Sequence, residues 1–116
     1  MTEKKKYRSV IFYKDHFESF FINQRKSVRN KILWTLELIE DIQKIPETYL
    51  KHIKNTDGLY EIRVQQGNDI FRIFCFFAQR RMIILMNGFQ KKSQKTPQKE
   101  IEKALKIKQE YESSEK

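Results

Sequence analysis

The stretch LYEIRVQQGNDIFRIFCFFAQRRMIILMNGF (residues 59–89) contains the pattern that decides the fold. Apolar and polar residues alternate over 60–65, which predicts a strand with one buried and one solvent-facing side. Residues 70–77 are apolar on both faces except for Arg72, and such a run is typical of a central strand. The segments QQGND and AQRR supply turns, and 82–86 forms a third strand. Because both connections are short, we expect an antiparallel three-stranded meander.

One strand and two helices are expected before this meander. YRSVIFY (7–13) is rich in β-branched and aromatic residues and predicts a first strand at the edge of the sheet. Apolar residues then recur at three- and four-residue steps over 16–43, which indicates two helices joined around 23–27. The second helix is expected to end before Pro46. The segment PETYLKHIKNTDG (46–58) is interpreted as a connector with one short helical turn.

A final helix is expected after the meander. Thr96 is the predicted N-cap and Pro97 the predicted first helical residue, because threonine and proline favour those two positions. The side of this helix that faces the core is expected to carry Ile101, Ala104, Leu105 and Lys108. Residues 112–116 are polar, and we expect them to fray.

The predicted fold class is α+β. The N-terminal strand and the meander form a small antiparallel sheet, which packs against two N-terminal helices and one C-terminal helix. A chain of 116 residues is too short for two independent cores, so we expect a single domain over 1–116.

The charge distribution points to a polyanionic partner. The net charge is +9, and residues 51–99 alone carry ten Lys and Arg against three Asp and Glu. Such an excess suits RNA, DNA, an acidic protein or an anionic membrane, although general solubility would explain it too. The single cysteine and the lack of an apolar leader or of a spanning stretch of roughly 20 apolar residues predict a cytoplasmic protein without a membrane partner.

Metal and cofactor sites are not expected. His16 and His52 are isolated in the sequence, and Cys75 stands alone in an apolar run, where it is most simply a core residue. The chain has no GxGxxG motif, no P-loop and no nucleophile elbow.

A group of basic residues is the strongest chemical signal. Arg63 projects from the polar face of its strand, two residues from Glu61, which is a possible ion-pair partner. Arg72 is the one charge in an apolar run, so it requires either a partner or an anion. Further cations follow the last strand: Lys91, Lys92, Lys95 and Lys99. If the strand register aligns the two arginines, they would bind phosphate, either to stabilise a transition state or as a passive nucleic-acid contact.

At these residues the sequence resembles a known family. The blocks GLYEIRV, GNDIFRIFCFF and MIILMNGFQKKSQKTPQKEIEKAL resemble the HigB-like, phage-derived branch of the RelE/ParE toxin superfamily, over residues 49–105. The resemblance implies the toxin of a type II toxin–antitoxin system. It also implies a ribosome-dependent mRNA endonuclease, in which the ribose 2′-hydroxyl attacks the adjacent phosphate and no metal is needed.

The resemblance also implies roles for individual residues. Arg63 and Arg72 would hold the scissile phosphate, and Lys91 and Lys92 would neutralise charge or donate a proton to the leaving oxygen. The residues expected to bind RNA are Lys95, Lys99 and Lys54. Glu61 stands where many relatives carry a basic residue, and it is either a proton acceptor or a salt-bridge partner of Arg63. No residue is assigned to stack on a base, because Tyr60 is predicted to point into the core.

The expected partners are a cognate antitoxin with a helix-turn-helix domain, the ribosome and mRNA, with operator DNA bound only through the antitoxin complex. Two alternatives stay open at this point: a ParE-like toxin that poisons DNA gyrase, and a non-catalytic module that binds an antitoxin and nucleic acid. The lysines after the last strand favour RNA.

Overall fold

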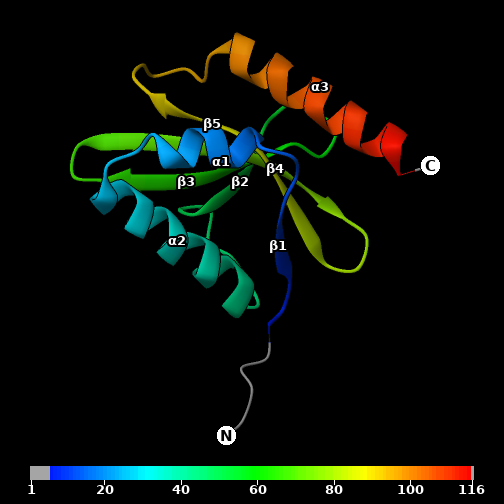
Figure 1. The fold of residues 1–116 in the computed structure, drawn as a ribbon, viewed down its shortest axis with the longest axis horizontal. Coiled ribbons are helices and arrows are strands. Elements are labelled where there is room, and N and C mark those ends of the chain that lie inside the picture. The colour runs from blue at the N-terminus through cyan, green and yellow to red at the C-terminus, as the bar shows by residue number, and fades with distance from the viewer. Residues whose placement is uncertain (1–5, 116) are drawn as a thin grey trace, which may run out of the picture.

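Five strands form one mixed sheet at the centre of the computed structural model, which describes residues 6–115 (Figure 1). The strands are β1 (Ser9–Phe12), β2 (Leu50–His52), β3 (Tyr60–Gln66), β4 (Asp69–Ala78) and β5 (Met82–Lys91), in the spatial order β1-β5-β4-β3-β2. The helices are α1 (His16–Ile22), α2 (Lys26–Asp41) and α3 (Gln98–Ser114). The α+β class is confirmed. None of these helices is long and apolar enough to cross a membrane.

The predicted meander is present. Strands β3, β4 and β5 pair antiparallel, and β4 lies in the middle of the sheet with six consecutive buried residues, 71–76. Gly67 has a φ of +62° in the turn between β3 and β4, a conformation that glycine adopts without strain. The register places Arg63 directly opposite Arg72.

The sheet differs from the predicted one in two respects. β1 pairs with β5 in parallel rather than antiparallel, which is possible because the long connection between them contains two helices and three strands. The predicted connector contains β2, which pairs antiparallel with β3. A strand of three residues is too short to show a period, so the alternation pattern could not reveal it.

The last strand is longer than predicted. β5 continues from Met82 to Lys91, with an irregular register opposite the stretch between Ile73 and Cys75. Lys91 is therefore the final residue of a strand and not part of a polar loop. Because Lys91 pairs with Ile70, its side chain lies on the same sheet face as that of Arg72.

Both faces of the sheet are covered. Helices α1 and α2 pack on one face, where Phe17, Ile32 and Ile39 meet buried residues of β3, β4 and β5. Helix α3 packs on the other face, where Ala104 and Ile107 meet a second buried group (Figure 1). Burying one large apolar side chain stabilises the fold by about 1.5–3 kcal/mol, so the two layers of core hold the sheet firmly between them.

The last helix begins one residue later than predicted. Pro97 is its N-cap, and no side-chain hydrogen bond caps this end. Leu105 was expected in the core but is 36% exposed, because the buried face of α3 is centred on Ala104 and Ile107. The helix continues to Ser114, into the stretch that we expect to fray, and Lys116 lies outside the described residues.

A tight contact between α1 and β5 predicts the effect of one substitution. A Cβ atom added at Gly88 would lie 2.5 Å from Cδ2 of Phe20. Gly88→Ala is therefore expected to lower the free energy of unfolding by about 1–3 kcal/mol, the usual cost of overpacking. Urea denaturation measures it. In a Phe20→Ala background the same change is expected to cost almost nothing, and an equal cost in both backgrounds would contradict the contact.

Candidate functional site

Basic side chains from neighbouring strands gather on the face of the sheet that α3 covers, beyond the start of that helix. Arg63 of β3 faces Arg72 of β4, and Lys91 of β5 lies one position further along the same face. Helix α3 begins close to Asn87, whose Nδ2 donates to the backbone oxygen of Glu100 at 3.3 Å. The sheet register thus brings together three of the residues that the sequence singled out.

A buried carboxylate links the two arginines. Glu61 is 7% exposed, and its Oε2 lies 3.3 Å from Nε of Arg63 and 3.3 Å from Nε of Arg72. Arg72 is itself only 6% exposed, and its Nη1 donates to the backbone oxygen of Phe71 at 3.0 Å. Two guanidinium groups on facing positions would repel each other, and Arg72 is buried, so the shared carboxylate is what allows them to lie side by side.

The ion pair between Arg72 and Glu61 does not include a hydrogen bond. The buried Nε–H of Arg72 makes no hydrogen bond, although it lies within ion-pair distance of Glu61. Arg63 is more exposed than Arg72, and its Nη1 donates to the backbone oxygen of Glu47 at 3.3 Å. The two guanidinium groups therefore keep donors that their shared carboxylate does not use.

The electrostatics of the site affect Lys91. Burial lowers the pKa of Lys91, the positive charge of Arg72 lowers it further, and Glu61 opposes both effects. Burial also lowers the pKa of Arg72, while the charge of Glu61 raises it. A lysine with a lowered pKa gives up its proton more readily than an ordinary one, which is the property needed in a proton donor.

Lys51 is a member of this site that the sequence did not reveal. It lies on β2 directly opposite Glu61, and its charge is among those that lower the pKa of Lys91. It was missed because β2 itself was not predicted. Only the alternation in LKH could have indicated it, and three residues are too few for a period. We refer to Arg63, Arg72, Lys91 and Lys51, arranged around Glu61, as the basic cluster.

The remaining predicted lysines lie outside the basic cluster. Lys92, Lys95 and Lys99 are exposed along the connection from β5 into α3. Lys54 is exposed in the turn after β2, and within residues 6–115 no contact joins it to the basic cluster.

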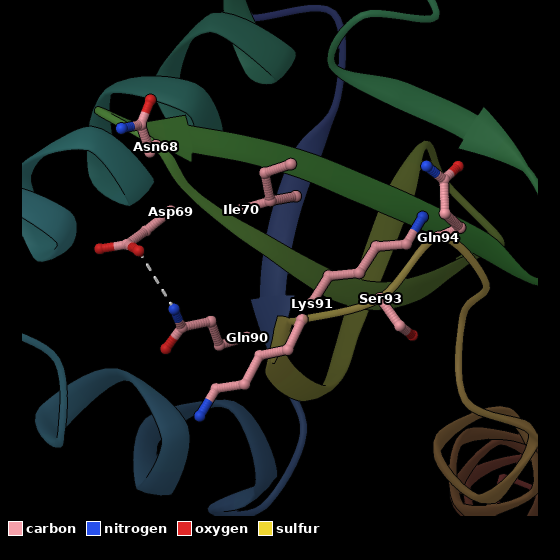
Figure 2. Close-up of a pocket in the computed structure, with 8 residues that line it drawn as sticks. Asn68, Asp69, Ile70, Gln90, Lys91, Ser93 and Gln94 are labelled. Atoms are coloured by element: carbon pink, nitrogen blue, oxygen red, sulfur yellow. Dashed lines mark hydrogen bonds between the residues drawn. The ribbon is translucent and has the colours of Figure 1, made fainter.

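One shallow cleft contains both Lys91 and Lys92. It lies between the β3–β4 turn and the end of β5, and Figure 2 shows Lys91 in it together with Ser93 and Gln94. Gln90 Nε2 donates to Asp69 Oδ1 at 3.3 Å across this cleft, which ties the end of β5 to the turn (Figure 2). Lys92 can therefore reach an anion in the cleft without being part of the basic cluster.

The residues set aside at the start stay apart in space. Cys75 is fully buried, and burial raises the pKa of its thiol, as expected for a core residue. Among residues 6–115, no three His, Cys, Asp or Glu side chains lie close enough together to form a metal site.

Comparison with models of known protein families places most of the chain in one family. The family model described as Phage derived protein Gp49-like (DUF891) matches residues 19–109, which is more than half of the chain and includes all of the basic cluster. A search of curated proteins finds no match.

The basic cluster predicts a measurable pKa. The pKa of Lys91 is expected to lie below its ordinary value of 10.5 and to rise in an Arg72→Gln variant, because that change removes a nearby positive charge. NMR titration of the ¹³C-labelled lysine ε-carbons measures this. The control Lys106→Met alters an exposed residue of α3 and is expected to leave the pKa of Lys91 unchanged. A pKa that does not respond to Arg72→Gln would contradict the coupling.

Proposed function

Because this chain belongs to the Gp49-like family, whose members are RelE/HigB-like toxins of toxin–antitoxin systems, we propose that it is an endoribonuclease that cleaves mRNA on the ribosome. The observation that carries this proposal is the pair of arginines on facing strand positions, held by one buried carboxylate beside a lysine with a lowered pKa. Placement in the HigB branch belongs to the same proposal.

In the proposed reaction the basic cluster holds the scissile phosphate. Arg63 and Arg72 donate hydrogen bonds to its non-bridging oxygens, which gain negative charge when the ribose 2′-hydroxyl attacks phosphorus. The new bond joins O2′ to phosphorus, and the bond from phosphorus to O5′ breaks. The products are a 2′,3′-cyclic phosphate and a free 5′-hydroxyl, and the 2′-hydroxyl proton passes to solvent water.

Lys91 supplies the proton in this scheme. The departing O5′ requires one, and a lysine beside Arg72 whose pKa is lowered by burial gives up its proton more readily than a free lysine does. Lys92 is exposed and lines the same cleft as Lys91, so we assign it to charge neutralisation rather than to proton transfer.

Glu61 has a positioning role in this proposal. Its carboxylate lies at ion-pair distance from both arginines and is buried, so its negative charge is already engaged before any substrate binds. The same oxygen, Oε2, faces Nε of both arginines, so the carboxylate is placed as an ion-pair partner of the two guanidinium groups. This favours the ion pair over the alternative of proton abstraction.

The toxin family implies a cognate antitoxin as a partner. We propose that this antitoxin contains a helix-turn-helix domain and that the toxin reaches operator DNA only through their complex. We also propose that the protein binds the ribosome and mRNA in the cytoplasm. Lys95, Lys99 and Lys54 would then contact the phosphate backbone of the RNA. The net charge of +9 supports an RNA partner, because each phosphate neutralised by a lysine or arginine releases a counterion.

Substitutions in the basic cluster test this function. Arg72→Gln and Lys91→Met are each expected to reduce mRNA cleavage by roughly 10²- to 10³-fold, the usual effect of losing one group that stabilises developing charge. Primer extension on mRNA from induced cells maps and quantifies the cuts. The matched controls Arg80→Gln and Lys106→Met remove the same charges from exposed positions and are expected to cleave like the wild type.

Two results would contradict the proposal. A DNA-damage response with intact mRNA after induction would indicate gyrase poisoning instead. Efficient cleavage of naked RNA without ribosomes would show that the ribosome is not required.

A further inference from the structure

We infer that a cleft at the open edge of β3 binds the nucleobase of the RNA nucleotide next to the phosphate held by Arg63 and Arg72. This inference deepens the proposed function and rests on it. We call this site the edge cleft. It is distinct from the cleft of Lys91 and Lys92, although Ile70 lines both.

The location of the edge cleft is the first argument. Arg63 and Arg72 line one side of it, and Thr48 and Tyr49 line another. Since both arginines belong to the basic cluster, a phosphate bound there has its attached nucleoside within reach of the edge cleft. The volume of about 430 Å³ falls in the range of small-molecule sites and is large enough for one base.

An aromatic ring is present in the edge cleft. Tyr49 is half-buried, and its ring meets Trp34 at a centroid distance of 5.9 Å and an interplanar angle of 66°. Trp34 is fixed in turn by Lys31, whose Nζ lies 4.5 Å from the ring centroid. A tyrosine held by such packing offers a preformed surface for stacking, which is how proteins commonly bind unpaired RNA bases.

The backbone of β3 supplies hydrogen-bonding groups beside this ring. Pairing between β2 and β3 extends only to Ile62, after which Arg63 N donates to the backbone oxygen of Tyr49 at 2.8 Å. Backbone groups alternate in direction along a strand, so the N–H and C=O of Gln65 also point to this edge. No strand covers that edge at Gln65 in residues 6–115, so a donor and an acceptor are free there.

One side chain adds to this recognition surface. Thr48 is exposed beside Tyr49, and its hydroxyl makes no hydrogen bond within the described part of the chain. The edge cleft thus combines a ring, a free backbone donor and acceptor, a hydroxyl and the aliphatic side chains of Val64 and Ile70. The ring and the uncharged hydrogen-bonding groups suit a flat, polar-edged base, and the three cations that line the edge cleft, Lys31, Arg63 and Arg72, suit the phosphates attached to that base.

Cleavage mapping on ribosome-bound mRNA tests the inference. The wild type is expected to prefer particular bases at one fixed position beside the cut. Tyr49→Leu is expected to slow cleavage about tenfold and to flatten that preference, because a stacking surface is lost. Tyr49→Phe keeps the ring and is expected to cleave within about twofold of the wild type. Thr48→Val is expected to alter the base preference while the rate at the best sites stays high.

The outcomes separate the inference from the proposed function. If the wild type leaves mRNA intact, the proposed function fails and the inference fails with it. If the wild type cuts but Tyr49→Leu cuts the same sites at the same rate, the inference alone is overturned. It is also overturned if Tyr49→Leu weakens antitoxin binding and leaves cleavage unchanged, because the edge cleft would then bind a peptide. Thermal melting of each variant identifies losses due to misfolding, and Thr48→Val still tests the edge cleft if Tyr49→Leu does not fold.

Discussion

The ion pairs between Glu61 and its two arginines are the interaction on which the site depends. Arg72 lies in the central strand of the sheet, where an unpaired charge would cost several kcal/mol. The facing position is occupied by Arg63, so the strand register alone would place two like charges together. Glu61 offsets both charges from one position on β3, and the fold can therefore keep a pair of guanidinium groups aligned before any anion arrives.

Several features of the site follow from this arrangement. The charge on Arg72 contributes to the lowered pKa of Lys91, which connects β5 to the same electrostatic system. The short strand β2 contributes Lys51, and because β2 begins only at Leu50, opposite Ile62, the edge of β3 is open at Gln65. The arginine pair and the edge cleft, which we propose bind a phosphate and a base, are thus side by side because β2 is short and β3 is longer.

The sequence was sufficient for the parts of the structure that depend on local patterns. The alternation over 60–65 and the apolar run around Arg72 predicted β3 and β4, and the isolation of Arg72 in that run marked the site. Contacts between distant residues were not predictable in this way. The parallel pairing of β1 depends on the whole intervening chain, and Lys51 became visible only when pairing placed it opposite Glu61. The missed orientation of Leu105 has a similar origin, since the sheet selects which side of α3 is buried.

The most direct test of this account is a double-mutant cycle between Glu61 and Arg72 on the rate of mRNA cleavage. If Glu61 acts by holding the arginines, Glu61→Gln is expected to reduce the rate strongly in the wild type and much less in the Arg72→Gln background. The combined loss would then be smaller than the product of the two separate losses. A combined loss equal to that product would contradict the account, because Glu61 would then act on the substrate independently of Arg72.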